Sequence, residues 1–280
     1  MAYGKQGHSR AGRAGMVVIV SIASLALLAG LLFFNPWRAS GRGEPLMVHC
    51  AAVMAAPMEA IAAAYEKETG VRVQLQFGGS GTLMSGIKVS GQGDLFFAAD
   101  QSYLEMARED GLIVEAAELV RLTPVLAVAK GNPKGIAGVD ALANEGIRVS
   151  MANPDAASIG RVIKEVLVER GMWSAVEANV TRLGVFKPSV NDVANDVKLG
   201  ATDVAVVWDA VVLQYPELEA VAIAGAEQHV QSAGLGVLTT SKNPDGARRF
   251  MQYVAASDRG LEVLKGRGYS VVEGKPWAAE

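Results

Sequence analysis

The chain has 280 residues, half of them apolar, with 26 lysine and arginine residues against 29 aspartate and glutamate residues. This composition excludes a disordered protein, a disulfide-rich scaffold and a polybasic binder of nucleic acids. Since Cys50 is the only cysteine, an internal disulfide and a multi-cysteine metal site are excluded as well. The histidines are too few and too scattered for a histidine zinc site: His8, His49 and His229.

An apolar run of nineteen residues without charge, 16–34, dominates the N-terminal part of the chain. It follows a basic segment, 1–15, and has the length that a bilayer-spanning helix needs. A cleaved signal usually has a shorter apolar core, so we expect an uncleaved anchor, with signal cleavage as the alternative. The basic residues place segment 1–15 in the cytoplasm and the body outside, behind a linker at 35–45. A lipoprotein is not expected, because Cys50 lies well beyond the apolar run.

Strand and helix patterns alternate through the body of the chain, 46–280. Leu46–Ala51 is an apolar run of strand length, and helical spacing follows from Pro57 to Gly70. Val71–Phe77 alternates with period two, and a second helix follows the Gly78–Thr82 turn. Further strands are expected at Asp94–Ala98, Leu122–Ala129, Ile147–Met151, Val180–Val185, Val204–Trp208, Val221–Ile223 and Leu235–Thr240, and further helices at Gln101–Glu109, Ala157–Arg170, Ser189–Leu199 and Pro244–Ala255. The pattern predicts an α/β body with mostly parallel sheets flanked by helices, in two lobes at least as readily as in one.

Four junctions between a strand and a helix can present free backbone N–H groups to a ligand. They lie at Ala51–Met54, Gly78–Thr82, Pro154–Gly160 and Lys187–Asn191. In open α/β sheets the ligand crevice lies at the carboxyl ends of the strands, where helix N-termini also favour anions. Each junction alone is better explained by ordinary helix capping. Together they predict an uncharged cage for a small anion, to which Ser80 adds a hydroxyl donor.

Catalytic alternatives are poorly supported. Ser80 lacks the Gly-x-Ser-x-Gly spacing of a nucleophile elbow, because residue 82 is a threonine. No Walker A lysine motif and no Gly-x-Gly-x-x-Gly motif follows any expected strand. His49 and Cys50 are adjacent in a strand, so their side chains point to opposite faces and do not form a catalytic pair. We therefore expect a binding protein without a cofactor rather than an enzyme.

Three sequence runs resemble the periplasmic molybdate-binding proteins of ABC transporters. They are His49–Met54, Phe77–Leu83 and Gly93–Gln101, and the run DLFFAADQ within the last of them is the most specific part. The resemblance extends from about Leu46 to Gly268. It implies a type II periplasmic-binding fold, in which two α/β lobes joined by two crossing strands close over a tetrahedral oxyanion.

The same resemblance implies how the chain divides between the lobes. Residues 46–122 and 241–280 would form the first lobe, and residues 129–234 the second. Leu122–Ala129 and Leu235–Thr240 would be the crossing strands. The implied ligand is molybdate or tungstate, and the implied partner is the permease of an ABC transporter in the membrane.

The resemblance also implies which residues hold the ligand. Ser80 matches a serine that donates through its hydroxyl and backbone. Val190 matches a backbone N–H donor, and Ile159 stands where the family usually has a small residue that donates its N–H. Val53 stands where a serine is expected, and Trp208 where the family has a tyrosine whose hydroxyl reaches the ligand. An indole N–H can only donate and a fully deprotonated oxyanion can only accept, so the tryptophan is compatible with that contact.

The departures at Val53 and Trp208 leave other small anions, such as phosphate or sulfate, as alternatives on the same fold. A carboxylate in the cage would favour a protonated anion such as hydrogen phosphate, and three aspartates lie near the junctions: Asp155, Asp192 and Asp209. A membrane-tethered sensor domain that has lost its coupling to transport is an alternative from another class. The expected function is capture of a small oxyanion outside the cytoplasm and its delivery to a transporter.

Overall fold

The computed structural model describes residues 1, 44–272 and 277–278. The expected membrane segment 16–34 and its flanks up to residue 43 lie outside the described residues. Within the described ranges, no helix combines the length and the apolar character needed to cross a bilayer. All of the elements below belong to one compact unit, Gly43–Glu280.

The first lobe is built on a sheet with the strand order β11-β4-β10-β3-β1-β2, and β12 also pairs with β4. Its strands are β1 (Leu46–Ala51), β2 (Val73–Gly78), β3 (Leu95–Ala98), β4 (Ile113–Leu122), β10 (Gln231–Leu238), β11 (Ser270–Val271) and β12 (Trp277–Ala278). The helices that accompany it are the 3-10 turn η1 (Ala52–Met54), α2 (Ala55–Thr69), α3 (Ser80–Ser90), α4 (Gln101–Glu109), α9 (Pro244–Val254) and α10 (Gly260–Gly266).

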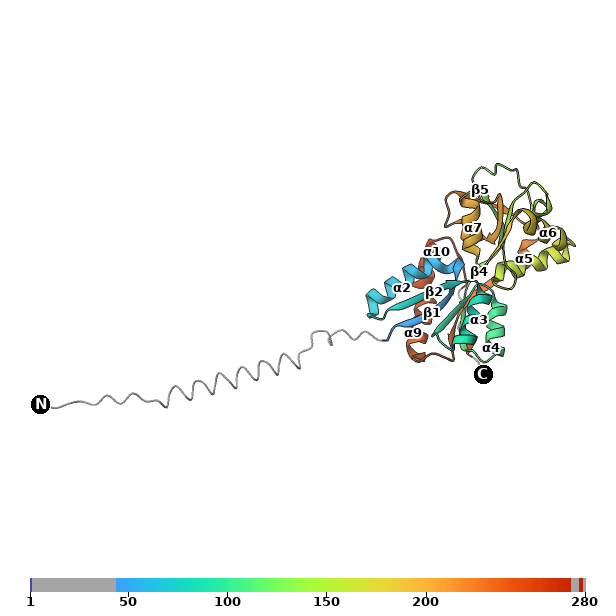
Figure 1. The fold of residues 1–280 in the computed structure, drawn as a ribbon. Coiled ribbons are helices and arrows are strands. Elements are labelled where there is room, and N and C mark those ends of the chain that lie inside the picture. Colours follow the sequence, from blue (N-terminus) through green and yellow to red (C-terminus); the bar gives the residue numbers. More distant parts are fainter. Residues whose placement is uncertain (2–43, 273–276, 279–280) are drawn as a thin grey trace. The chain divides into compact units, whose positions relative to one another are not determined.

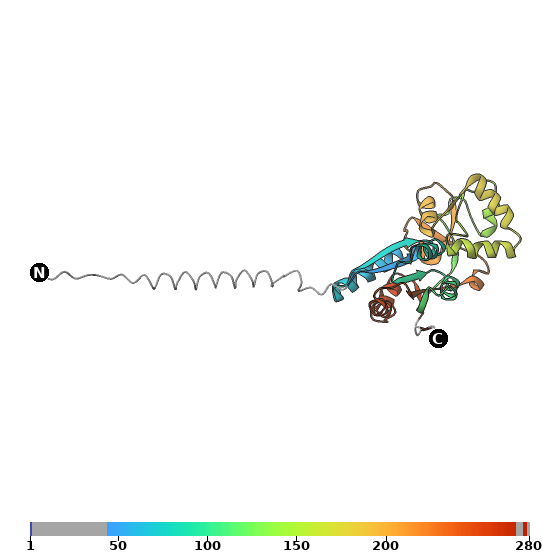
Figure 2. The same ribbon diagram turned by 60° about the horizontal axis from the view of Figure 1, so that its bottom comes forward.

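The second lobe is built on a sheet with the order β7-β6-β8-β5-β9. Its strands are β5 (Pro124–Ala129), β6 (Val149–Ala152), β7 (Val185–Lys187), β8 (Val204–Trp208) and β9 (Leu218–Ala222). Its helices are η2 (Val139–Ala143), α5 (Ser158–Glu169), α6 (Trp173–Leu183), α7 (Val190–Lys198), α8 (Asp209–Val212) and η3 (Ala226–His229). Figures 1 and 2 show the two sheets in separate lobes, each with its helices on the outside.

The prediction of mostly parallel sheets is wrong, because both sheets are mixed. β1 is parallel to β2 and β3, and β6 is parallel to β7 and β8. β10 runs antiparallel to β3 and β4, and β5 runs antiparallel to β8 and β9. Parallel neighbours need a crossover connection, usually a helix. The strands at the passages between the lobes, β5 and β10, run antiparallel to both of their neighbours.

The expected crossing strands differ from those in the structure. The expected strand Leu122–Ala129 is two strands, because β4 ends at Leu122 in the first sheet and β5 begins at Pro124 in the second. β4 itself, from Ile113, was not predicted. The expected strand Leu235–Thr240 is part of β10, which begins at Gln231 and lies wholly in the first sheet. The return from the second lobe therefore precedes β10, in segment 223–230.

The predicted strand Val180–Val185 is also wrong, since Trp173–Leu183 forms helix α6. Val176 and Val180 are four residues apart and both buried, which is helical spacing. Asn179 between them donates its side-chain N–H groups to the carbonyl oxygens of Leu142 at 2.9 Å and Ile147 at 3.0 Å. The run of β-branched residues indicated a strand, but burial along one helical face decides the local structure.

The topology gathers several helix starts at one edge of each sheet. β1 leads into η1 and β2 into α3 in the first lobe, while β6 leads into α5 and β7 into α7 in the second. β1 and β2 are parallel, and so are β6 and β7, so their carboxyl ends meet at a common edge. A ligand crevice is expected at such edges.

Candidate functional site

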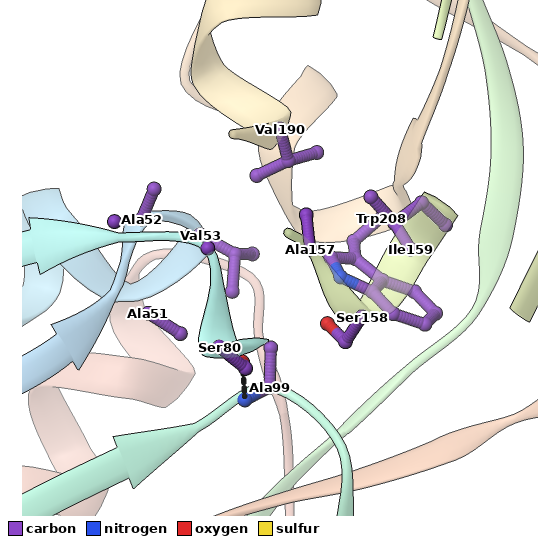
Figure 3. A pocket seen from close by; sticks show the side chains of 12 residues that line it. Ala51, Ala52, Val53, Ser80, Ala99, Ala157, Ser158, Ile159, Val190 and Trp208 are labelled. Atoms are coloured by element: carbon purple, nitrogen blue, oxygen red, sulfur yellow. Dashed lines mark hydrogen bonds between the residues drawn. The ribbon is translucent and has the colours of Figure 1, made fainter. Parts of the chain in front are cut away.

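A pocket lies between the lobes at the carboxyl ends of these parallel strands (Figure 3). Its walls enclose about 210 Å³, including the part that is open to solvent. The enclosed space is small, so this pocket suits an ion or a very small molecule rather than a drug-sized ligand. Every residue that lines it has an uncharged side chain: Ala51, Ala52, Val53, Gly78, Gly79, Ser80, Ala99, Ala157, Ser158, Ile159, Val190 and Trp208.

All five residues that the sequence analysis selected line this pocket. The first lobe contributes Val53 and Ser80, and the second contributes Ile159, Val190 and Trp208. The first N–H groups of a helix have no partner within the helix, and they carry the positive end of its dipole. The structure therefore brings the predicted donors together, while their contact with a ligand stays a prediction.

Ser80 is the first residue of α3, and 1% of its surface is exposed. Its Oγ accepts the backbone N–H of Ala99 at 3.1 Å, so the hydroxyl proton is free to be donated. A Cβ on Gly79, the preceding residue, would lie 2.3 Å from the carbonyl oxygen of Ala156 and 2.6 Å from that of Pro188. Glycine at this position therefore allows the two lobes to meet directly beside the serine.

Ser158 is a pocket residue that the sequence analysis did not select. It is the first residue of α5, as Ser80 is of α3, and it is 3% exposed. Figure 3 shows its hydroxyl group on the side that faces Ser80. Among the residues that the structure describes, its side chain has no hydrogen-bond partner. Its equivalent position at a helix start is a signal in the sequence, although the donor expected at this junction is the N–H of Ile159 beside it.

Trp208 ends β8 and is 1% exposed. In Figure 3 the nitrogen of its indole ring lies on the side of the ring nearer to Val53. No described residue accepts a hydrogen bond from this N–H. This N–H is therefore free to donate to an acceptor in the pocket.

Direct hydrogen bonds join the lobes around the pocket. The backbone N–H of Thr82, in α3 of the first lobe, donates to the carbonyl oxygen of Ala156 in the second at 3.1 Å. The Nδ2 atom of Asn191, in α7 of the second lobe, donates to the carbonyl oxygen of Ala52 at 3.0 Å. These contacts define a closed arrangement of the lobes.

An ion pair adds to this closure. Arg161 of α5 donates to the carboxylate of Asp100 at the start of α4, and to the hydroxyl of Ser102 at 2.7 Å. The Asp100 side chain is 1% exposed and that of Arg161 is 30% exposed. Burial alone would lower the pKa of the guanidinium, but the charges of Asp100 and Glu165 outweigh burial and raise it. Asp100 directly follows the pocket residue Ala99, so the ion pair lies next to the site.

The three aspartates near the junctions stay outside the pocket. Asp155 is exposed, and Asp192 accepts the hydroxyl of Ser189 at 2.6 Å. Asp209 accepts the backbone N–H of Thr123 at 3.1 Å, at the point where the chain crosses between the lobes. Because none of them lines the pocket, the carboxylate that would favour a protonated anion is missing from its walls.

Two ionisable groups buried close to the pocket, the Cys50 thiol and the Tyr269 hydroxyl, are uncharged at neutral pH. Burial raises the pKa of the Cys50 thiol far above its usual value, and Glu59 raises it further. Burial also raises the pKa of the Tyr269 hydroxyl. Within the described ranges, no group of three or more histidine, cysteine, aspartate and glutamate side chains could hold a metal ion. The walls of the pocket therefore offer neutral hydrogen-bond donors and helix dipoles, and the charged pair of Arg161 and Asp100 lies beside them.

The model of one protein family, the bacterial extracellular solute-binding proteins, matches residues 46–270. The chain therefore belongs to this family of periplasmic binding proteins. It is a solute-binding protein of the kind that serves ABC transporters, not an enzyme, and such proteins act without a cofactor. Its two-lobed α/β fold agrees with the expectation from the sequence, except that the sheets are mixed rather than mostly parallel.

Individual relatives agree with this assignment. A Bacillus subtilis protein assigned as an ABC transporter substrate-binding lipoprotein, YvgL, is 27% identical over 248 residues, 87% of this chain and 93% of that protein. The molybdate-binding protein ModA of Escherichia coli is 26% identical over 241 residues, 80% of this chain and 94% of ModA.

Solved structures share the fold. The periplasmic molybdate-binding protein of Azotobacter vinelandii superposes with a TM-score of 0.69 at 22% identity, covering 81% of this chain and 99% of that one. The sulfate-binding protein SubI of Mycobacterium tuberculosis gives a TM-score of 0.67 at 16% identity, covering 82% of this chain and 88% of SubI. Structures that differ in their named ligands thus share this fold.

Proposed function

We propose that the protein captures a small, fully deprotonated tetrahedral oxyanion, molybdate or tungstate, and delivers it to the permease of an ABC transporter. Ser80, Val53, Ile159, Val190 and Trp208 would hold the anion. The observation that carries this proposal is the pocket wall, which combines uncharged donors from both lobes with no carboxylate. The names of the molybdate-binding relatives support the choice of molybdate and tungstate.

The chemistry of the wall separates protonated from unprotonated anions. A fully deprotonated oxyanion only accepts hydrogen bonds, and the hydroxyls of Ser80 and Ser158 and the indole of Trp208 can all donate to it. Hydrogen phosphate carries an O–H that needs an acceptor, and burying it without one costs roughly 1–3 kcal/mol. The wall therefore favours molybdate, tungstate or sulfate over phosphate. Sulfate is the second candidate, because it matches the same donors.

The N-terminal segment completes the proposal. The apolar run 16–34 would anchor the protein to the cytoplasmic membrane, with the binding body on the outer side. The support is the length of this run and the basic residues that precede it. An anchored binding protein would release its anion close to the permease.

Calorimetric titration tests the proposal. The full-length protein in detergent micelles is titrated with molybdate, tungstate, sulfate and phosphate in the same buffer. We expect one anion per chain, with molybdate and tungstate binding at least tenfold more tightly than phosphate. Tightest binding of phosphate would contradict the proposal, and tightest binding of sulfate would replace molybdate by the second candidate.

A further inference from the structure

The carbonyl oxygen of Val53, on the first-lobe wall of the pocket, accepts two side-chain hydrogen bonds. The hydroxyl of Tyr269 donates to it at 2.6 Å, and Nε2 of Gln214 donates at 3.1 Å. Tyr269 belongs to the first lobe and precedes β11, whereas Gln214 belongs to the second lobe and follows α8. Gln214 therefore reaches this carbonyl across the gap between the lobes.

The directions of these hydrogen bonds are fixed by the number of protons. The single hydroxyl proton of Tyr269 is used on Val53, so the tyrosine oxygen accepts from Nε2 of Gln214, 3.0 Å away. Nε2 also lies 3.3 Å from the carbonyl oxygen of Ala210. Tyr269 is 4% exposed, and its raised pKa keeps the proton in place at neutral pH. The amide of Gln214 thus has one favourable orientation.

A second carboxamide holds the peptide group on the other side of Val53. Asn191 of the second lobe donates to the carbonyl oxygen of Ala52 at 3.0 Å. This carbonyl and the N–H of Val53 belong to one planar trans peptide, in which the two groups point in opposite directions. The position of the Ala52 carbonyl therefore fixes the direction of the Val53 N–H, which is the donor expected from this turn.

The side-chain amide of Asn191 has an unfavourable feature for stability. Its Oδ1 atom is buried and has no hydrogen-bond partner among the described residues. A buried acceptor without a partner destabilises the protein, and an apolar side chain of similar shape would remove this penalty. Stability alone therefore does not explain why residue 191 is an asparagine. Its Nδ2 atom, however, makes the hydrogen bond to the Ala52 carbonyl beside the pocket.

We propose that Asn191 and Gln214 are positioning residues, which orient the two peptide groups flanking Val53 when the lobes close. The first lobe already holds both carbonyls, through the N–H of Ala55 on Ala52 and the hydroxyl of Tyr269 on Val53. Closure of the lobes adds the two carboxamide bonds and so tightens the orientation of the turn. The inference rests on the proposed function, because it assigns the two carboxamides to the capture of the same oxyanion.

The Asn191→Leu variant tests the inference with a matched control on the same helix. Asn195 is exposed on α7, so Asn195→Leu makes the same chemical change away from the lobe contact. Binding and dissociation of molybdate are measured on the full-length protein by calorimetry and stopped flow. We expect Asn191→Leu to raise the Kd about three- to tenfold through faster dissociation, since one hydrogen bond of the closed state is lost. Its melting temperature without ligand should equal or exceed that of the wild type.

A second pair of variants makes the same test at Gln214. Gln214→Met removes the amide at nearly constant length, and Gln252→Met, at an exposed position on α9, is its control. Combined with Tyr269→Phe, Gln214→Met should show a non-additive effect on Kd, because the two side chains form one network. Deuterium exchange at residues 51–54 of the molybdate-bound protein should increase in Asn191→Leu and Gln214→Met only.

The outcomes distinguish the inference from the proposed function. A wild type that binds none of the four oxyanions would overturn both. If the wild type binds molybdate and the Asn191 and Gln214 variants match their controls, the inference alone is overturned. It is also overturned if both variants lose affinity only in proportion to a lower melting temperature, because that result indicates a merely structural role.

Discussion

The hydroxyl oxygen of Ser80 accepts the backbone N–H of Ala99 at 3.1 Å, which leaves the hydroxyl proton available to the pocket. This bond joins the start of α3 to the end of β3 and sets the direction in which the serine can donate. Ser80 is thus bound on one side by the protein and free to bind an acceptor on the other.

Replacement of Ser80 by alanine should weaken oxyanion binding by about tenfold or more, because hydrogen bonds to charged groups contribute roughly 1.5–3 kcal/mol. It should also lower the stability of the ligand-free protein, since the N–H of Ala99 loses its acceptor. Ser158→Ala should weaken binding without that loss of stability, because the Ser158 side chain has no partner among the described residues. Titration and thermal unfolding of both variants check this, and equal loss of stability in both would contradict it.

Replacement of Trp208 by phenylalanine keeps an aromatic ring but deletes the indole N–H. We expect a loss of affinity comparable to that of Ser80→Ala. The ligand-free protein should also become less stable, because Trp208 is fully buried and the smaller ring leaves a cavity. Titration with molybdate measures the effect, and unchanged affinity would show that the indole does not replace the tyrosine hydroxyl.

Replacement of Val53 by serine should tighten oxyanion binding several-fold, since it adds a hydroxyl donor beside the anion. The gain is limited because the new hydroxyl loses its hydration. The protein itself should become less stable, by roughly 1–3 kcal/mol, because Val53 is buried and its apolar surface is lost. Chemical unfolding and titration are measured on the same sample. Weaker binding of every oxyanion would place this side chain away from the ligand.

The ion pair between Arg161 and Asp100 joins the two lobes, so its removal should weaken ligand binding by destabilising the closed state. Asp100→Asn removes the buried partner of Arg161, whose side chain is 30% exposed and keeps Glu165 at 2.7 Å as a second counter-charge. The cost therefore stays below the roughly 3–5 kcal/mol of breaking a fully buried pair. Because the pair joins the lobes, part of this cost appears only in the closed state. We expect Kd for molybdate to rise at least tenfold, as measured by titration at low salt.

Asp203→Asn is the matched control for the closure effect, because Asp203 pairs with Arg148 within the second lobe. Hydrogen bonds from Arg148 hold the pKa of Asp203 below its usual value. This pair therefore stabilises the protein fully above the usual carboxyl pKa of about 3.9. The stabilisation is lost as the pH falls through the lower pKa that Asp203 has in the folded protein. The control should change acid stability but not affinity. Equal losses of affinity in both variants would contradict a role for closure.

The sequence predicted the pocket because its walls come from short local patterns. Each strand followed by a helix start can be recognised from consecutive residues, as at Ser80 and Val190, and the parallel strands then bring these junctions together. Ser158 was within reach of the same argument. The run Val180–Val185 was mistaken for a strand because β-branched residues also fit a helix that is buried along one face.

The carboxamides that hold Val53 were beyond such reasoning. Asn191 lies 139 positions from Ala52, Gln214 lies 161 positions from Val53, and Tyr269 lies 216 positions from it. Their partners are backbone carbonyls, which every residue has, so no residue type marks the pairing in the sequence. The contacts of Asn191 and Gln214 are defined only by the closed arrangement of the lobes, whereas the contact of Tyr269 lies within the first lobe.

The most direct test of the central claim is an anomalous diffraction map of crystals grown with molybdate, measured at the molybdenum absorption edge. The account predicts one strong peak per chain inside the pocket, with oxyanion density within hydrogen-bond distance of the Ser80 hydroxyl and the Trp208 indole nitrogen. A peak elsewhere, or an empty pocket in crystals saturated with molybdate, would contradict the account.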